Sequence, residues 1–269
     1  MSSEPIITTY HQYYPPGVKQ VLASGSSAWV GDVNETTVFK YPLAPGGDME
    51  RLKIEQKILE VICPHPRIIT LKRVSDTGIY LERATNGTVA NYLLDSGIPS
   101  SSISTLQRVV WCRETAEAVA YIHTRYILHC DIQPTNILLD DKLHIKLADF
   151  QGKLLGEDGK VLLDGWSGEP TRFAFPRTGL SSDVYTELFA LGCTIYFIMM
   201  GYAVYPDIVD GSEDWRERVA ERFEKKDFPQ DDNACRAIIM KCWMQQYGSA
   251  DEIVNDLEAA ERYLGQDSE

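Results

Sequence analysis

An aspartate and an asparagine, Asp131 and Asn136, stand five residues apart in the stretch HCDIQPTNILL. The residues that follow, ILLDDKLHIKLADF, predict a hairpin of two short strands around a turn at 140–142. Because a hairpin folds back on itself, Asp149 at its far end should return close to Asn136. Two carboxylates and an amide oxygen are hard ligands that suit Mg²⁺ better than zinc. The spacing therefore predicts that Asp131, Asn136 and Asp149 converge on one site; the alternative is that Asp131 only caps a turn.

A helix expected at residues 48–62, opened by Asp48 and ended by Pro64, carries a glutamate on its apolar face. Glu55 is spaced so that it shares this face with three aliphatic residues, Leu52, Leu59 and Ile62. An inward carboxylate is costly without a cation beside it, and Lys40 at the end of the preceding strand is the obvious partner. The sequence thus predicts a Lys40–Glu55 ion pair; the alternative is a glutamate at the edge of the stripe that reaches solvent.

The whole chain has 269 residues, of which 44% are hydrophobic and 24% are charged, as in an ordinary globular protein. A formal net charge of −13 argues against nucleic acid or an anionic membrane as a partner. The six cysteines form no CxxC pair, which favours reduced, buried thiols in an intracellular protein. The N-terminus lacks the basic start and apolar core of a secretion signal. The apolar stretch 188–205 is interpreted as a buried helix, with a membrane span as the alternative.

Strand-like runs dominate the chain before residue 85, and helical patterns dominate after it. Strands first and helices afterwards predict an α+β fold of two lobes, a small antiparallel sheet and a larger helical body, with a hinge near 83–87. The expected parts are a flexible N-terminal tail at 1–17, a sheet lobe at 18–84, a helical lobe at 85–264 and a C-terminal tail at 265–269.

These residues together resemble the motifs of the protein kinase family. HCDIQPTN resembles the catalytic loop HRDxKxxN, DFQG at 149–152 resembles the DFG motif, and the separation of thirteen residues between Asn136 and Asp149 fits that pattern. Lys40 then matches the lysine of the third strand, and Glu55 matches its partner on the first large helix. The resemblance covers residues 18–262, and the HCD variant is similar to small, single-domain kinase-like proteins of fungi.

The resemblance implies a bilobal kinase-like fold and a phosphotransferase that uses ATP and Mg²⁺. Asp131 would orient the acceptor hydroxyl and take its proton. Lys40, held by Glu55, would contact the α- and β-phosphates, while Asn136 and Asp149 would hold Mg²⁺ against the nucleotide. The implied acceptor is a protein hydroxyl, on serine or threonine rather than on tyrosine.

The same alignment implies how the rest of the nucleotide is bound. ASGSSAWV matches the glycine-rich loop GxGxxGxV but keeps only Gly25, with Ala23 and Ala28 at the other glycine positions, so its backbone is less able to approach phosphate. The residues implied around the adenine are Val30, Val38 and Leu138 on its faces, the backbone of Glu82 to Ala84 along its edge, and Leu81 as gatekeeper. Plain core packing explains the apolar members of this set equally well.

Two departures from the kinase pattern bear on activity. Cys130 replaces the arginine that usually binds a phosphate on the activation segment, so activation by phosphorylation of Thr171 or Ser167 is not expected. Gln133 replaces a lysine that neutralises the γ-phosphate, and no other cation is expected there, which predicts weak activity or none.

Two further departures concern buried charges. AFPR at 174–177 replaces the APE motif without its glutamate, and the arginine that usually pairs with that glutamate is also missing, since none stands between Arg236 and Arg262. Losing both members of a buried ion pair can be neutral. Glu187 replaces an aspartate of the helix F motif and can still accept backbone hydrogen bonds.

Three functions therefore stay open: a weakly active protein kinase, a pseudokinase that binds nucleotide or acts as a scaffold, and a small-molecule phosphotransferase. The five retained polar residues favour the first, and the missing cations favour the second. DFQG and the apolar stretch 188–205 favour the protein-kinase branch over the third. We expect a protein substrate or binding partner, and neither nucleic acid nor membrane. We expect an intracellular location in the cytoplasm, and an additional location in the nucleus stays open. The sequence leaves the oligomeric state undetermined.

Overall fold

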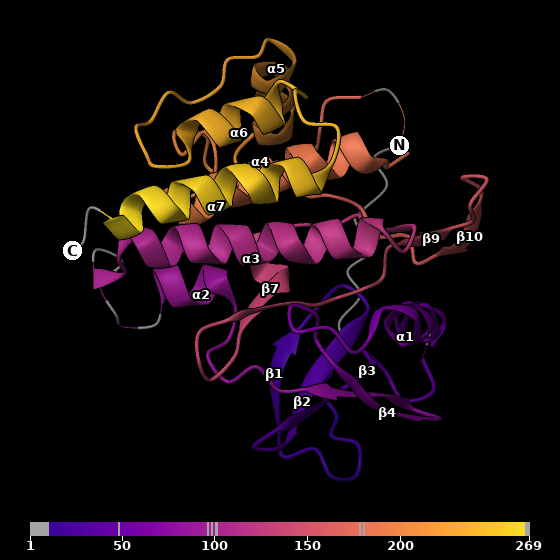
Figure 1. The fold of residues 1–269 in the computed structure, drawn as a ribbon. Helices are drawn as coiled ribbons and strands as arrows, with labels where there is room; N and C mark the ends of the chain where they lie inside the picture. Colours follow the sequence, from indigo (N-terminus) through magenta and orange to yellow (C-terminus); the bar gives the residue numbers. More distant parts are fainter. Residues whose placement is uncertain are drawn as a thin grey trace.

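The computed structural model describes residues 11–266 except 48, 96, 98, 100, 101, 178 and 180. Within this part the chain forms two lobes, a small one built on a sheet and a larger one built on helices (Figure 1). The chain passes from one lobe to the other directly after the last strand of the sheet. The predicted α+β, bilobal fold is confirmed.

The small lobe holds a five-stranded antiparallel sheet in the order β1-β2-β3-β5-β4. Its strands are β1 (Gln20–Ser24), β2 (Ala28–Asn34), β3 (Thr37–Pro42), β4 (Leu71–Ser75) and β5 (Gly78–Glu82). β3 lies in the middle, and four of the five residues that follow its first are apolar and buried. The central strand is therefore the one that carries Lys40 into the interior.

Helix α1 (Glu50–Ile62) packs beside this sheet and buries the face that the spacing predicted. Its buried residues are Leu52, Ile54, Glu55, Ile58, Leu59 and Ile62. Met49 precedes the helix without a side-chain cap, and the expected first residue, Asp48, lies outside the described residues. The helical period thus placed Glu55 correctly on the inward face.

The large lobe is organised around helix α4 (Val184–Met200), whose residues are almost all buried. Asp183 and Thr186 form a capping box at its start, and Gly201 ends it in the left-handed conformation that glycine adopts without strain. This is the helix expected at 188–205, and it begins and ends earlier than the apolar pattern. Among the described residues, no helix is both long enough and apolar enough to cross a membrane.

The other helices surround α4. They are α2 (Val89–Leu94), α3 (Thr105–His123), α5 (Trp215–Glu224), α6 (Arg236–Trp243) and α7 (Ala250–Gln266). Helices α3 and α7 lie side by side (Figure 1), joined by an ion pair of 2.5 Å between Arg113 and Glu261. Because α7 continues through Gln266, the first two residues of the expected C-terminal tail belong to a helix, and residues 267–269 lie outside the described part.

Two small sheets complete the large lobe. β7 (Ile137–Leu139) pairs with β8 (Ile145–Leu147), so the hairpin predicted after Asn136 is confirmed. β6 (Ile127–Leu128), β9 (Lys153–Leu155) and β10 (Val161–Asp164) form a second sheet in the order β10-β9-β6. The β9–β10 hairpin projects from the body (Figure 1), and it was not predicted although two apolar runs flank the turn GEDG.

The described end of the N-terminal segment differs from the flexible tail that was expected. The Tyr13 hydroxyl donates a hydrogen bond of 3.0 Å to the Pro42 carbonyl, and the Tyr41 hydroxyl donates one of 2.9 Å to the Tyr13 carbonyl. The two tyrosine rings also meet edge to face at 5.2 Å. Tyr13 therefore fastens this segment to β3, because its half-buried ring packs on Tyr41 and its hydroxyl has an acceptor. Residues 1–10 lie outside the described part.

Candidate active site

Lys40 joins three elements where the lobes meet. Its Nζ atom lies 2.6 Å from Glu55 Oε2 on α1 and 2.6 Å from Asp149 Oδ1, which follows β8. The predicted contact between Lys40 and Glu55 is confirmed, and Asp149 is added to it.

The charges of this trio depend on one another. Burial works against the charge of Lys40, but the attraction of Asp149 and Glu55 outweighs it, so the pKa of the ammonium lies above its ordinary value. Burial raises the pKa of Glu55 against the opposing pull of Lys40. Burial also works against the charge of Asp149, but there Lys40 prevails and the pKa is lowered. Lys40 is therefore a cation at neutral pH, placed where phosphate oxygens could replace or share its carboxylate partners.

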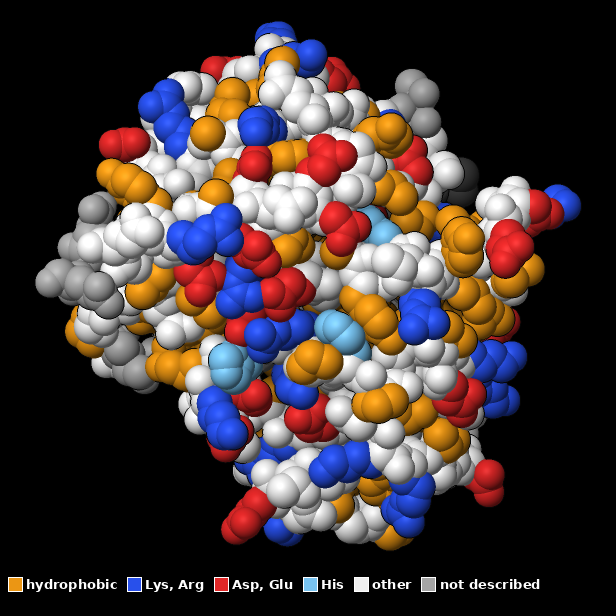
Figure 2. Space-filling view, viewed as in Figure 1, with side chains coloured by type: hydrophobic (Ala, Val, Ile, Leu, Met, Phe, Trp, Pro, Cys, Tyr) orange, Lys and Arg blue, Asp and Glu red, His pale blue; other side chains and the backbone are white. Residues whose placement is uncertain are grey.

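Helix α1 is fixed at its C-terminal end by α3. The Tyr121 hydroxyl donates a hydrogen bond of 2.9 Å to the carbonyl of Ile62, the last residue of α1, and the Tyr121 ring stacks on His65 at 4.0 Å. Arg67 continues this contact with an ion pair of 2.7 Å to the buried Glu114. Figure 2 shows basic and acidic side chains interleaved across the middle of this face. These contacts anchor the helix that presents Glu55.

Asp131 is held by two amides. Gln133 Nε2 donates to its Oδ1 atom at 2.6 Å, and Asn136 Nδ2 donates to its Oδ2 atom at 2.8 Å. Burial raises the pKa of Asp131 to about 6, with the charge of Asp149 adding to the effect and the hydrogen bonds opposing it. The carboxylate is thus oriented from both sides and binds a proton more readily than an exposed aspartate does.

Asn136 and Asp149 are brought together by the β7–β8 hairpin. Ile137 pairs with Leu147, and the Ala148 N–H donates to the Asn136 carbonyl at 2.9 Å. Because Asn136 uses its amide nitrogen on Asp131, its amide oxygen stays available as an acceptor, and 41% of the Asp149 side chain is exposed. In the described part of the chain no group of three or more His, Cys, Asp or Glu could hold a metal alone. Two oxygen ligands completed by phosphate and water are the usual arrangement for Mg²⁺, so these residues fit that ion.

Asp149 has a φ of 67°, a left-handed conformation that is uncommon outside glycine. Its neighbours hold it there. His129 Nε2 donates to the Ala148 carbonyl at 2.9 Å, and the buried ring of Phe150 meets the His129 ring edge to face at 5.0 Å. Strain of this kind persists only where the surroundings over-determine it, and it often accompanies a functional site.

Glu187 on α4 holds the backbone of the loop that carries Asp131. Its Oε1 atom accepts a hydrogen bond of 2.5 Å from the Cys130 backbone N–H, and its Oε2 atom lies 2.7 Å from His123 Nε2. The expectation that this glutamate accepts a backbone hydrogen bond is confirmed. Cys130 itself is buried, and burial raises the pKa of its thiol to about 12, so the side chain is neutral.

The residues expected on the adenine faces lie on adjacent strands. Val30 on β2 pairs with Lys40, Val38 on β3 pairs with the buried Leu81, and Leu138 on β7 bridges to Thr88 beyond the hinge. Their contact with a nucleotide stays a prediction.

The backbone just after β5 uses some of its N–H donors and leaves others without a partner among the described residues. The Glu82 N–H donates to the Thr70 carbonyl and the Arg83 N–H to the Thr36 carbonyl, whereas among the described residues no hydrogen bond uses the Ala84 N–H. The Glu82 side chain turns away to the Thr70 hydroxyl at 2.8 Å. The Ala84 N–H is therefore available as a donor, and its contact with an adenine edge stays a prediction.

Gly25 closes the turn between β1 and β2, where its N–H donates to the Ala28 carbonyl at 2.9 Å. The tip of this loop is Ser26-Ser27, and Ser27 makes a contact that sequence reasoning missed. Its hydroxyl donates to Gln151 Oε1 at 3.2 Å, and Gln151 Nε2 donates to Glu55 Oε2 at 3.3 Å. The available signal was the glutamine of DFQG, which stands where the kinase motif has glycine.

The activation segment carries two arginines whose partners were also missed. Arg177, in the AFPR sequence, pairs with Glu169 at 2.8 Å, so the position that lost a glutamate gained the opposite charge and a local partner. Arg172 is buried and donates to the carbonyls of Val204, Tyr205 and Ile208, and it pairs with Asp210 at 2.6 Å. Arg172 thus ties the segment to the loop after α4, whereas Arg177 pairs within the stretch that precedes α4.

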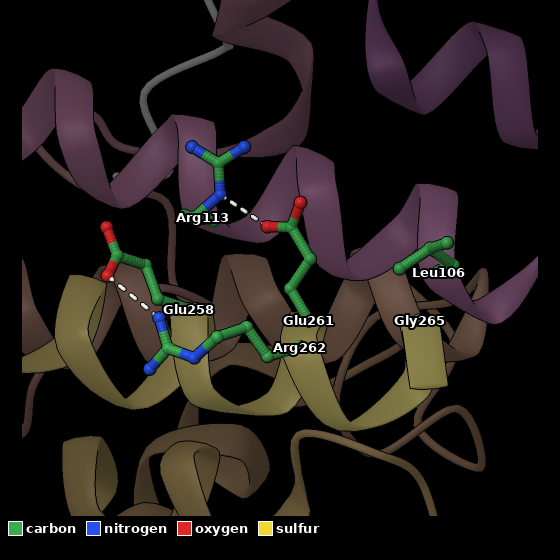
Figure 3. A pocket seen from close by; sticks show the side chains of 6 residues that line it. All are labelled: Leu106, Arg113, Glu258, Glu261, Arg262 and Gly265. Atoms are coloured by element: carbon green, nitrogen blue, oxygen red, sulfur yellow. Dashed lines mark hydrogen bonds and ion pairs between the residues drawn. The ribbon is translucent and has the colours of Figure 1, made fainter. Parts of the chain in front are cut away.

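Two cavities lie away from the predicted site. One of about 370 Å³ opens between the ends of α3 and α7 (Figure 3), where Arg113 points to Glu261 and Arg262 to Glu258. Another of about 290 Å³ lies on the small lobe among Tyr13, Tyr14 and several prolines. Neither is lined by a residue of the predicted site, so the chemistry of the side chains, not cavity size, identifies it.

Comparison with known proteins agrees with this geometry. The family model described as "Protein kinase domain" matches residues 40–249. The chain is 30% identical to serine/threonine-protein kinase kin-29 of Caenorhabditis elegans over 163 residues, which are 58% of this chain and 19% of the relative. It is 32% identical to serine/threonine-protein kinase GIN4 of Saccharomyces cerevisiae over 187 residues, 64% of this chain and 15% of the relative. With CBL-interacting serine/threonine-protein kinase 8 of Arabidopsis thaliana the values are 26% over 196 residues, 70% and 42%. The chain therefore spans less than half of the length of each of these relatives.

Proposed function

Because the chain belongs to the protein kinase family, we propose that it transfers the γ-phosphate of ATP to a serine or threonine hydroxyl of a protein. The observation that carries this proposal is Lys40, bound at 2.6 Å by both Glu55 and Asp149 in one site with Asp131. Phosphoryl transfer depends on positioning and charge neutralisation, and each of these four residues has a part in one or the other.

Asp131 is the base of the proposed reaction. It orients the acceptor hydroxyl and takes its proton, while the amides of Gln133 and Asn136 keep its two oxygens in place. A pKa of about 6 leaves it largely ionised at neutral pH yet a stronger base than an ordinary aspartate.

Lys40 positions the α- and β-phosphates, and Glu55 holds Lys40 toward them. The adenine lies against Val30, Val38 and Leu138, with its edge on the backbone from Glu82 to Ala84. Gly25 lies in the loop that covers the phosphates.

Asn136 and Asp149 are the residues that would hold Mg²⁺, which when bound neutralises phosphate charge. Gln133 offers a neutral amide where a lysine is usual, so we propose a slow enzyme. The same amide is the observation that favours a second candidate, a pseudokinase that binds nucleotide without transferring phosphate.

Specificity for serine or threonine is supported by the names of the relatives, all of which are described as serine/threonine-protein kinases. The lobe boundaries at 18–84 and 85–264 and an intracellular, cytoplasmic location belong to the same proposal. A reducing, intracellular location is supported by the six free cysteines.

The test is phosphate transfer with and without Asp131. Purified native protein and Asp131→Asn are incubated with Mg²⁺ and ³²P-labelled ATP and with generic protein acceptors, and binding of Mg-ADP is measured separately by thermal shift. We expect transfer to fall at least about 100-fold in Asp131→Asn, since general-base catalysis is removed, while ADP affinity is kept. Asp141→Asn, an exposed aspartate in the turn of the same hairpin, is the matched control and should transfer at the native rate.

Equal transfer by native protein and Asp131→Asn would contradict the assignment. Binding of Mg-ADP without any transfer that depends on Asp131 would instead identify the pseudokinase. Transfer to aminoglycosides or choline but not to proteins would identify a small-molecule phosphotransferase.

A further inference from the structure

Gln151 touches both elements of the small lobe that enclose the predicted site. Its side chain is 5% exposed, accepts from the Ser27 hydroxyl at 3.2 Å and donates to Glu55 Oε2 at 3.3 Å. Ser27 lies at the tip of the loop between β1 and β2, and Glu55 lies on α1. One side chain from the activation segment thus connects the loop over the nucleotide to the helix that holds Lys40.

Only an amide of this length can make both contacts. The Glu55 carboxylate only accepts hydrogen bonds, so the amide nitrogen of Gln151 must face it and the amide oxygen must face Ser27. Glycine, the residue usual at this position of the motif, has no side chain for either contact. A glutamate could accept from Ser27 but would place a second negative charge against Glu55.

The backbone of Gln151 is held firmly on the large lobe. A Cβ atom at Gly165 would collide with the Gln151 carbonyl, and one at Gly152 would collide with the carbonyls of Leu128 and His129. The Gly165 N–H also donates to the Gly152 carbonyl at 2.9 Å. Glycine at these two positions lets the strands close on the segment, so Gln151 presents its amide from a fixed base.

We propose that Gln151 is a positioning residue that couples the β1–β2 loop to the Lys40–Glu55 pair, so that closure of the loop and the inward position of α1 occur together. This inference rests on the proposed function, because it assigns Gln151 a part in ordering the nucleotide site. Kinases that carry an arginine at the position of Cys130 can order this region through a phosphate. Here a neutral thiol occupies that position, and the Gln151 amide supplies a contact that needs no phosphate.

The test is a double-mutant cycle between Ser27 and Gln151. The variants are Ser27→Ala, Gln151→Met, which keeps the length of the side chain without its polar atoms, and the two combined. Hydrogen–deuterium exchange of a peptide covering residues 24–28 is measured in the nucleotide-free protein. Loss of one hydrogen bond should speed exchange in each single variant by about fivefold, and the double variant should be no faster than the single ones.

Ser26→Ala is the matched control, since Ser26 is the neighbouring hydroxyl at the same tip and, among the described residues, makes no side-chain hydrogen bond to Gln151. Its loop should exchange at the native rate. Additive effects of Ser27→Ala and Gln151→Met, or native exchange in both, would overturn the coupling. Thermal unfolding of each variant shows whether faster exchange of the loop reflects the lost local contact or a less stable fold. Exchange that is faster only in proportion to global unfolding would also overturn the coupling.

Affinity for Mg-ADP gives a second readout that a merely structural role would not move. We expect the dissociation constant to rise by about fivefold in Ser27→Ala, in Gln151→Met and in their combination alike. Exchange of the nucleotide-free loop needs neither binding nor transfer, so a protein without phosphotransfer would fail the proposed function and still test this coupling. Native affinity in all three variants would overturn the assignment of Gln151 to the nucleotide site.

Discussion

The two ends of the proposed site, one for the nucleotide and one for the acceptor hydroxyl, are held by different chemistry. At the nucleotide end, Lys40 meets two carboxylates, Glu55 and Asp149, at 2.6 Å each. At the acceptor end, Asp131 meets two neutral amides, those of Gln133 and Asn136, at 2.6 and 2.8 Å. The distances are alike, but among the described residues the side-chain donors are a cation at the first end and neutral amides at the second.

This difference predicts that the two ends affect different steps, nucleotide binding at one and phosphate transfer at the other. Charge complementarity at Lys40 serves the α- and β-phosphates, which a kinase and a nucleotide-binding pseudokinase both need to hold. Charge at the acceptor end matters chiefly in the transition state, where the transferring group develops negative charge. A site with a cation at its nucleotide end and neutral amides at its acceptor end should bind nucleotide well and transfer phosphate slowly.

The largest effect is expected from Lys40→Met. The substitution leaves the buried Glu55 beside the partly exposed Asp149 without their cation, so it should lower the free energy of unfolding by about 3 kcal/mol. It should also abolish detectable transfer, because no other ammonium in the site contacts these carboxylates among the described residues. Urea denaturation and ³²P transfer are the measurements.

A control for Lys40→Met is Lys241→Met on α6, which removes an ion pair of similar length, 2.7 Å to Asp256, on the surface. That variant should lose at most about 1 kcal/mol and keep transfer. Phosphate transfer at the native rate by Lys40→Met would contradict the role proposed for the cation at the nucleotide end.

The next effect is a gain, expected from Gln133→Lys. A lysine here would bring a cation beside Asp131 and the transferring phosphate, and we expect kcat to rise about tenfold with the KM for ATP nearly unchanged. Gln133→Met, which removes the amide without adding charge, should lower kcat instead. Steady-state kinetics of the three proteins decides the matter; an equal kcat in Gln133→Lys and native protein would show that charge at this end is not limiting.

A smaller effect on stability is expected at the surface ion pair between Lys241 and Asp256. Asp256 accepts from Lys241 at 2.7 Å and from the Tyr247 hydroxyl at 2.5 Å, and these hydrogen bonds lower its pKa below the ordinary range. A carboxyl whose pKa is lower in the folded state contributes stability above its unfolded pKa of about 4 and loses it as the pH falls through the folded value. Asp256→Asn should therefore cost about 0.5 kcal/mol at pH 7 and nothing near pH 2. Thermal unfolding at both pH values measures it, and an equal cost at both would mean that the pair contributes no charge-dependent stability.

Sequence patterns predicted the contacts that are local or periodic. Glu55 was placed inward because a helix repeats every three to four residues, and Asp149 was placed beside Asn136 because a hairpin returns on itself. Lys40 followed from the cost of burying Glu55 alone. The two lobes, strands first and helices afterwards, could also be predicted, since the hydrophobic period changes near residue 85.

The contacts that were missed join positions far apart in the chain. Gln151 reaches Ser27 and Glu55 across 124 and 96 residues, and no period or spacing in one sequence relates them. Arg172 meets carbonyls of the loop after α4, whose positions depend on how that loop closes. Tyr13 was assigned to a flexible tail because prolines and a glycine follow it, but its ring and hydroxyl have partners on β3 that turn chemistry does not reveal.

The smallest effect is expected where phosphorylation acts on many kinases. We expect Thr171→Glu and Ser167→Glu, as mimics of phosphate, to change kcat/KM by less than about twofold, because the two arginines in the described part of the segment, Arg172 and Arg177, already pair with carboxylates. The side chain of Cys130 is a buried, neutral thiol, and Arg172 already has carbonyl and carboxylate partners. The same kinetic assay, repeated on protein treated with phosphatase, measures the effect without relying on a mimic. A gain above about tenfold would require a phosphate receptor that these residues do not supply, and the acceptor end would then be ordered by modification and not by the fixed contact of Glu187 with the Cys130 backbone.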